Sequence, residues 1–137
     1  MQSVEFPYVE EESKVFNKVK RPKISVDFFS KVDDEWLTLD DVLADTGADV
    51  SMLPRYIGEL AVGDITTGKY VEIKGIEPSA MLSAFIHELK ARIKDKEFEL
   101  PVAIADSNDV PSVLGRIKGL DIFDANFIRG DRIKISW

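Results

Sequence analysis

The residues of this chain that are best suited to chemistry lie around Asp45. Three apolar residues precede this carboxylate, and Thr46 and Gly47 follow it. The pattern predicts a buried strand that ends at Asp45, where an unpaired charge beside apolar residues has a large desolvation cost. The Thr46 hydroxyl can donate and accept hydrogen bonds, and Gly47 lets the backbone turn sharply and approach a ligand or second chain. The alternative is a strand-ending turn with a capping aspartate, and this segment alone does not separate the two.

Three other patterns are weaker candidates for a site. Residues 63–70 follow Gly-x4-Gly-Lys but end in Tyr70, where a phosphate loop requires Ser or Thr and then a helix. The single histidine, His87, has no nucleophile-elbow serine motif, which favours a structural or surface role. The acidic residues between Asp40 and Asp49 lack the alternating ligands and glycine of an EF-hand loop. We expect no metal and no cofactor.

The composition limits the classes of protein that the chain can represent. Its 137 residues predict one domain, since domains usually have about 100 to 200 residues. With 18 Lys and Arg against 25 Asp and Glu, the net charge of −7 argues against nucleic acid as a partner. The absence of cysteine excludes disulfides and thiolate sites, and no segment approaches the length of a membrane span. We expect a cytoplasmic protein with no membrane partner.

The elements that position Asp45 are predicted to be strands. Residues 1–22 combine acidic and basic runs, and we interpret them as a solvated arm with at most one short strand near 15–19. From residue 23 to 137, apolar and polar residues alternate between turn signals, which indicates β-strands in a single domain. The fold class is therefore all-β, with an N-terminal arm.

Turn residues and short apolar runs locate two hairpins and two short helices. Lys94–Lys96 and Arg129–Asp131 separate alternating segments as hairpin turns do, and the second predicts a C-terminal hairpin. Residues 54–60 predict one or two helical turns, and 118–124 predict another.

Two motifs together carry a resemblance to a known family. Asp45–Ala48 spells Asp-Thr-Gly-Ala, and residues 49–54 continue as Asp-Val-Ser-Met-Leu-Pro. Downstream, Val113–Arg116 spells Val-Leu-Gly-Arg, before a predicted short helix and a final strand. The pair resembles the retropepsin-like, single-domain aspartic proteases, and their cellular bacterial and archaeal branch more than the viral enzymes. The resemblance extends from about Pro22 to Trp137.

This resemblance implies a closed barrel with a flap hairpin, which residues 70–76 and 81–89 would form. It also implies roles for individual residues. These are Asp45, Thr46 and Gly47 for catalysis; Ala48, Asp49, Gly75, Ile76, Glu77 and Pro78 for substrate binding; and Leu114, Gly115 and Arg116 for support of the site. Asp49 is expected to pair with Arg116.

The chemistry of this family requires two carboxylates that share one proton. The chain has a single Asp-Thr-Gly, so the second carboxylate would come from another copy across a two-fold axis. The resemblance therefore implies a homodimeric endopeptidase acting on peptides or proteins, inert as a monomer. The final strand, Arg132–Trp137, is expected to join its symmetry mate in a sheet between subunits.

The segment at the flap tip departs from the family pattern. Glu77 and Pro78 follow Gly75 and Ile76, where relatives are usually glycine-rich. Proline stiffens the turn and glutamate adds charge, so flap opening and substrate choice do not follow from the resemblance. One alternative is a non-catalytic dimeric module that binds extended peptides or serves in assembly. Another is an enzyme that a partner domain activates, with residues 1–22 involved.

Overall fold

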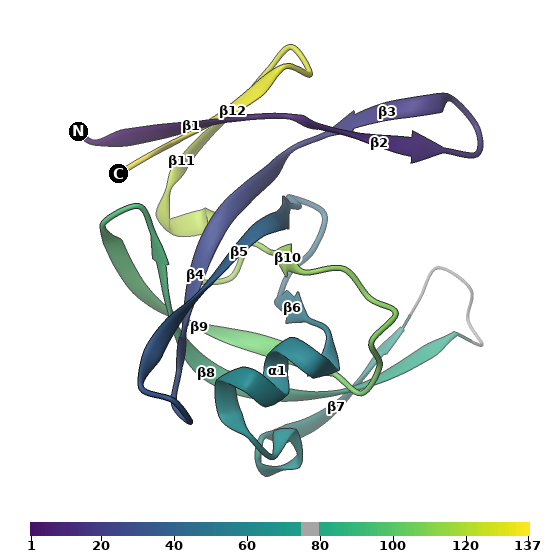
Figure 1. Ribbon diagram of the computed structural model, residues 1–137, viewed down its shortest axis with the longest axis vertical. Helices are drawn as coiled ribbons and strands as arrows, with labels where there is room; N and C mark the ends of the chain where they lie inside the picture. The colour runs from purple at the N-terminus through teal and green to yellow at the C-terminus, as the bar shows by residue number, and fades with distance from the viewer. Residues whose placement is uncertain (75–79) are drawn as a thin grey trace.

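The computed structural model describes residues 1–74 and 80–137 (Figure 1). Its elements in chain order are β1 (Ser3–Pro7), β2 (Val9–Ser13), β3 (Asn17–Arg21), β4 (Lys23–Ser30), β5 (Glu35–Ala44), β6 (Ser51–Leu53), α1 (Arg55–Val62), the short helix η1 (Ile65–Thr67), β7 (Lys69–Lys74), β8 (Met81–Ile93), β9 (Lys96–Ala105), β10 (Val113–Leu114), the short helix η2 (Leu120–Ile122), β11 (Asp124–Ile128) and β12 (Arg132–Ser136).

The central sheet closes into a barrel. Its strands follow the order β4, β5, β10, β6, β9 and β8, and a further pairing of β4 with β8 completes the ring. Every second residue of β4 is fully buried, including Ile24, Val26 and Phe28, as expected of a strand with one face on a core. β7 pairs with β8 outside this ring and forms a hairpin with it. The predicted all-β barrel is confirmed.

Helix α1 packs against the barrel through a close contact. A Cβ at Gly58 would lie 2.2 Å from Cγ2 of Ile104 in β9, so the helix can approach the sheet only because Gly58 has no side chain. Ile57 and Ala61 are buried on the same side. The helix predicted over residues 54–60 is confirmed. Within the described residues, no helix combines the length and apolarity needed to cross a membrane.

A second sheet of three strands, in the order β1, β12, β11, lies at the other end of the barrel (Figure 1). Ile133 and Ile135 of β12 are fully buried and belong to the same core as the barrel. β11 and β12 form the predicted C-terminal hairpin, with Gly130 at φ +67° in the turn. The hairpin between β8 and β9 also forms as predicted, and η2 is the short helix expected within residues 118–124.

The sheet order corrects the expectation for Arg132–Trp137. β1 pairs with one edge of β12 and β11 with the other, over five residue pairs each. The backbone of Trp137 continues this pairing with Gln2 at 2.9 Å. A strand with both edges occupied has no free hydrogen-bonding groups for a third. Within the described chain β12 therefore has no free edge for its symmetry mate, and β1 and β11 are the outer strands of this sheet.

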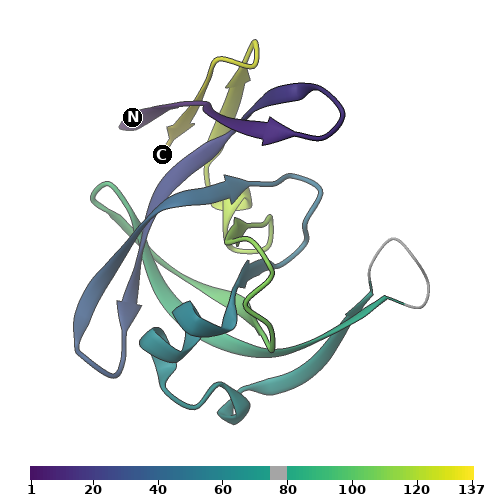
Figure 2. The same ribbon diagram turned by 45° about the vertical axis from the view of Figure 1, so that its right-hand side comes forward.

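The N-terminal segment also differs from its prediction, because residues 1–22 contain three strands. β2 and β3 form a two-stranded antiparallel ribbon, which extends beyond the barrel in Figure 2. Ion pairs connect the two strands, with 3.7 Å between Glu10 and Lys18 and 3.1 Å between Glu11 and Arg21. The expectation of at most one strand was wrong because the charged residues pair across the ribbon. The domain boundary after residue 22 stays a prediction.

Candidate active site

Asp45 lies immediately after β5, where β10 runs parallel to the end of that strand. Its backbone N–H donates to the Leu114 carbonyl at 3.0 Å, which fixes the point at which β5 ends. The half-buried side chain turns back over the loop, where Oδ1 accepts the Gly47 N–H at 2.9 Å. A Cβ at Gly47 would lie 3.2 Å from this oxygen. Glycine thus leaves the carboxylate accessible above the turn.

The loop after Asp45 is held by the backbone of the second motif. The Arg116 N–H donates to the Ala48 carbonyl at 2.9 Å, and the Ile117 N–H donates to the Asp49 carbonyl at 2.8 Å. Gly115 allows this approach, because a Cβ there would lie 2.7 Å from the backbone of Val50. The structure thus brings together the two motifs that are separate in the sequence.

Ser51 also contributes to this arrangement, which the sequence pattern did not predict. Ser51 is fully buried, and its Oγ accepts the Gly115 N–H at 2.9 Å. A buried N–H without a partner is unfavourable, so this hydroxyl stabilises the closest contact between the motifs. The available signal was a serine inside an otherwise apolar strand, since Met52 and Leu53 complete β6.

The expected ion pair between Asp49 and Arg116 does not form within the described chain. The Arg116 guanidinium instead contacts the Asp121 carboxylate, with 3.3 Å from Nε to Oδ1. The cause is local, because the Asp121 N–H also donates to the Arg116 carbonyl at 3.0 Å and holds the two residues together. Asp49 is exposed, and its carboxylate has no hydrogen bond or ion pair among the described residues.

The loop also presents the side chain of Thr46 to solvent. Thr46 is exposed, and its hydroxyl makes no hydrogen bond within residues 1–74 and 80–137. Among the described residues, Asp45 forms no ion pair. Nor do these residues contain a group of three acidic or histidine side chains that could hold a metal ion. A single chain therefore supplies one accessible carboxylate at this position.

The barrel carries an apolar row beside this loop, on the sheet face opposite to the core residues Ala44, Leu53 and Val102. Strand register aligns one residue from each of five neighbouring strands, so their side chains share a face. These residues are Leu43, Val113, Met52, Ala103 and Ile86. The row begins two residues before Asp45 and ends at β8, one strand of the hairpin.

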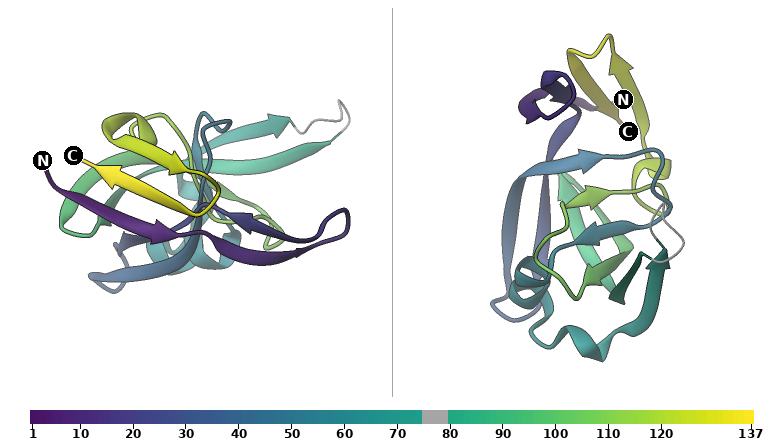
Figure 3. Two further views of the ribbon diagram at one scale, coloured as in Figure 1. Left: turned by 90° about the horizontal axis from the view of Figure 1, so that it is seen from above. Right: turned by 90° about the vertical axis from the view of Figure 1, so that its right-hand side faces the viewer.

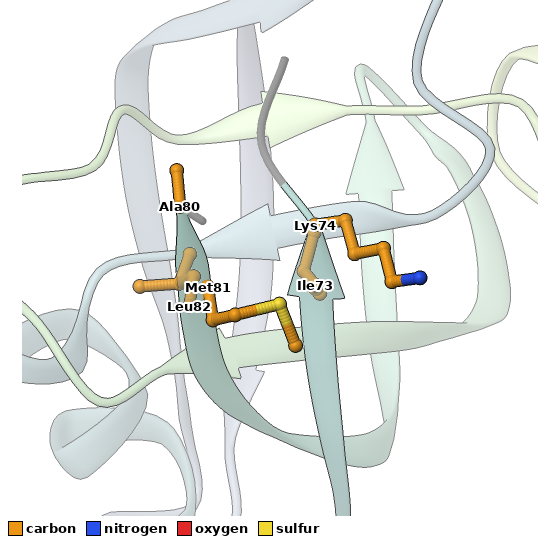
Figure 4. Close-up of a pocket in the computed structure, with 5 residues that line it drawn as sticks. All are labelled: Ile73, Lys74, Ala80, Met81 and Leu82. Atoms are coloured by element: carbon orange, nitrogen blue, oxygen red, sulfur yellow. The ribbon is translucent and has the colours of Figure 1, made fainter. Parts of the chain in front are cut away.

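β7 and β8 form a hairpin over the segments predicted for a flap, with six residue pairs from Lys69–Ile86 to Lys74–Met81, and its role as a flap stays a prediction. The predicted substrate-binding residues 75–78 lie outside the described residues. Where the described strands end, side chains line a pocket of about 220 Å³, and Met81 extends across it toward Ile73 (Figure 4).

The base of this hairpin accounts for two weaker sequence candidates. His87 is buried, and its Nε2 lies 2.7 Å from the Ile65 carbonyl oxygen, which is a structural role. β7 begins at Lys69, so a strand rather than a helix follows Gly68 and the segment is not a phosphate loop.

A closed barrel whose Asp-Thr-Gly loop is braced by an apolar-Gly-Arg strand has the architecture of retropepsin-like aspartic proteases. No protein-family model matches the sequence, and the search of curated proteins found no match. Among solved structures, a retropepsin-like aspartic protease from Rickettsia conorii is similar over 98% of this chain and 91% of its own, with a TM-score of 0.61 and 17% identity. EIAV protease in complex with the inhibitor HBY-793 matches 71% of this chain and 83% of its own, with a TM-score of 0.47 and 26% identity. The chain has a retropepsin-like fold.

Proposed function

We propose that this protein is a homodimeric aspartic endopeptidase with one catalytic Asp45 per subunit. The observation that carries the proposal is the Asp45 loop, because it holds the carboxylate of the Asp-Thr-Gly motif accessible at the end of β5 on a retropepsin-like fold. The chain contains a single Asp-Thr-Gly, so a second copy must supply the other carboxylate. An isologous two-fold contact places the same loop of both subunits at one centre.

The proposed reaction uses the two carboxylates in different protonation states. Negative charges about 3 Å apart cannot both persist, so the pair holds one proton and titrates as a unit. The ionised Asp45 takes a proton from water, and the water oxygen bonds to the peptide carbonyl carbon. The partner's Asp45, which is protonated, gives its proton to the carbonyl oxygen. The carbon–nitrogen bond then breaks as the nitrogen takes a proton from the pair, and one hydroxyl of the intermediate returns a proton to the pair as the carbonyl re-forms, so the pair again holds one proton.

The residues beside Asp45 have separate proposed tasks. Thr46, whose hydroxyl is free within the described chain, would contact the same residue of the second copy and hold the two loops together. Gly47 would let substrate backbone approach, and the exposed Asp49 carboxylate would accept hydrogen bonds from substrate N–H groups. Ala48 would contribute to the same edge of the site. Leu114, Gly115 and Arg116 would support the loop through the backbone contacts described above.

Substrate would lie between the apolar row and the β7–β8 hairpin. The row offers half-buried side chains, among them Leu43, Met52 and Ile86, to apolar groups of an extended peptide. The hairpin, including residues 75–78, would close over the peptide and exclude water. The proposed partners are thus a second copy and a peptide or protein substrate, with no nucleic acid. A cytoplasmic location stays a prediction.

The proposal is tested by assaying cleavage of an unfolded protein between about pH 3 and 7, the range in which carboxylate pairs titrate. Wild-type protein is expected to cleave and to dimerise, while Asp45→Asn loses cleavage by at least about a hundredfold because general acid–base catalysis contributes roughly that much. Asp41→Asn, at an exposed site on β5, the strand that leads to Asp45, is the matched control and should keep full activity. Cleavage that persists in Asp45→Asn contradicts the assignment of this site.

The second candidate is a dimeric module that binds extended peptides without cleaving them. The Glu77–Pro78 sequence favours it, because a stiff, charged flap tip suits retention of a peptide better than rapid opening. Stable dimers that cleave nothing across this pH range, yet bind an extended peptide, would establish this alternative.

A further inference from the structure

The β2–β3 ribbon stands apart from the rest of the chain. Its two strands pair with each other, and among residues 1–74 and 80–137 neither has substantial contact with another element. An isolated two-stranded ribbon is at best marginally stable in water. Here an ion pair between Glu11 and Lys23 at the start of β4 fastens the ribbon at its base. The far end has no comparable support within the described chain.

That far end carries an exposed apolar tip. Val15 is 80% exposed and Phe16 is 73% exposed, the largest values for large apolar side chains after Met1 among the described residues. The tip has a defined shape, because Ser13 Oγ accepts the N–H groups of both residues at 3.2 Å. Asn17, with φ +65°, completes the turn. The two adjacent side chains form a small exposed apolar patch, and burying it against another protein surface is favourable.

The charge of the ribbon complements the rest of the chain. Residues 9–21 carry four basic and three acidic side chains, a net charge of +1, whereas the chain carries −7 and its remainder therefore −8. Lys14, next to the apolar tip, has no ion pair among the described residues. A cationic, apolar tip matches the acidic body of a second copy of this chain.

The ribbon also points in the direction that a second copy requires. Figures 1 and 2 show its tip, the loop between β5 and β6, and the far end of β7 on one side of the molecule, with both termini on the opposite side. The right-hand view in Figure 3 looks onto this side and shows the ribbon nearly end-on. A partner that faces the Asp45 loop therefore lies in the path of the tip.

We propose that the β2–β3 ribbon is a dimerisation arm, whose Val15 and Phe16 pack against the second copy of this chain. The inference rests on the proposed function, because the proposed active site determines which side of the molecule faces the partner. Because a two-fold axis makes the contact reciprocal, each subunit both supplies an arm and receives one. Both tips are buried in the dimer, so their effect on association is doubled.

The arm is tested by sedimentation equilibrium of the full chain. Replacing Val15 and Phe16 together by serine removes the apolar contact twice per dimer, and we expect the dimer Kd to rise at least tenfold. Val32→Ser is the matched control, because Val32 is 57% exposed in the turn between β4 and β5. It should leave the Kd unchanged. Both variants alter exposed side chains, and matching far-UV circular dichroism checks their folding. A wild-type Kd in the double variant overturns the arm and assigns the tip to another partner.

A second measurement uses the absence of cysteine from the chain. Val15→Cys provides a single attachment point for an environment-sensitive fluorophore, and Val32→Cys provides the control. As the concentration rises through the Kd, the label at position 15 should shift to shorter wavelength while the label at 32 does not. No shift at position 15 in a protein that dimerises overturns the arm.

Peptidase activity separates this inference from the proposed function. If the arm is correct, the double serine variant reaches wild-type activity per dimer, but at a higher protein concentration. Dimers that cleave nothing, with the Kd still raised in the double variant, overturn the proposed function and support the arm. Wild-type dimers that are active, together with an unchanged Kd in the double variant, support the proposed function and overturn the arm. A wild-type protein that stays monomeric at every concentration overturns both.

Discussion

At the scale of single residues, the Asp45 loop depends on hydrogen bonds that have few substitutes. Two carbonyls of the loop accept the N–H groups of Arg116 and of Ile117, the residue after the second motif, and Ser51 accepts a third from Gly115. Each bond requires backbones close enough that a side chain at Gly115 would overlap with Val50. The carboxylate is therefore positioned mainly by main-chain contacts, and a defect in these contacts would misplace it without touching it.

Ser51→Ala tests this dependence. Removal of the hydroxyl leaves the Gly115 N–H buried without a partner, and we expect a loss of about 2 kcal/mol in the free energy of unfolding. Activity should fall as well, since the loop loses its closest support. Ser25→Ala is the control, because the Ser25 hydroxyl bonds to Asp40 at an exposed site and should contribute well under about 1 kcal/mol. Urea unfolding of both variants measures the difference, and equal losses would contradict the role of Ser51.

Sequence patterns predicted part of this site and missed the rest for a physical reason. Asp45 and the Gly-Arg motif were recognisable because their residue types and order are unusual. The contact between Arg116 and Asp121 was not recognisable in the sequence. Whether Arg116 pairs with Asp49 or with Asp121 depends on where η2 places the Asp121 carboxylate. Ser51 was missed because a buried serine has no signature until its neighbour in space is known.

At the scale of elements, alternation of apolar and polar residues predicted the barrel strands and the C-terminal hairpin, because each has one face on the core. The ribbon escaped prediction because neither face of β2 or β3 is buried. Its stability comes from cross-strand charges, which in sequence resemble the charged runs of a solvated arm. The position of β12 between β1 and β11 was also missed, since pairing between distant strands leaves no local pattern.

The charges at the base of the ribbon predict a pH dependence at this scale. The hydrogen bond from Lys23, with help from Arg21, lowers the pKa of Glu11 below its usual value of 4.5. A carboxyl with a lower pKa in the folded than in the unfolded chain stabilises the fold when the pH is above the unfolded pKa. This stabilisation is lost as the pH falls through the folded pKa. The ribbon should therefore loosen in acid, below about pH 4.5.

Hydrogen exchange of the β2 and β3 amides measures this effect where it occurs. At neutral pH, Glu11→Gln should lower protection of these amides about twofold, as expected for a partly exposed ion pair worth about 0.5 kcal/mol. Below the folded pKa of Glu11, the variant and wild type should converge. Glu12→Gln, which alters a carboxyl with no ion pair among the described residues, should match wild type throughout. A difference that persists in acid would contradict the linkage.

At the scale of the whole molecule, association has to overcome like charge. Two chains of −7 approach one another in the proposed dimer, and the basic tip of the ribbon offers opposite charge to the partner. Net repulsion acts over a distance of about 10 Å in 0.1 M salt and further in dilute buffer. In the proposed dimer, the basic, apolar tip of the ribbon is attracted to the acidic partner. An uncharged tip would leave the repulsion between the two chains unopposed.

Two charge reversals separate net repulsion from this local contact. Lys14→Glu and Lys94→Glu each bring the chain from −7 to −9, but Lys14 lies at the ribbon tip and Lys94 in the turn between β8 and β9, on the opposite side of the molecule (Figure 1). Raising the salt concentration should lower the dimer Kd of wild type and of both variants, because it screens the repulsion. At low salt, Lys14→Glu should raise the Kd several times more than Lys94→Glu, since only its charge meets the partner directly. Sedimentation equilibrium across a salt series measures both effects. Equal Kd values for the two variants would show that net charge alone governs association and that the tip lies outside the interface.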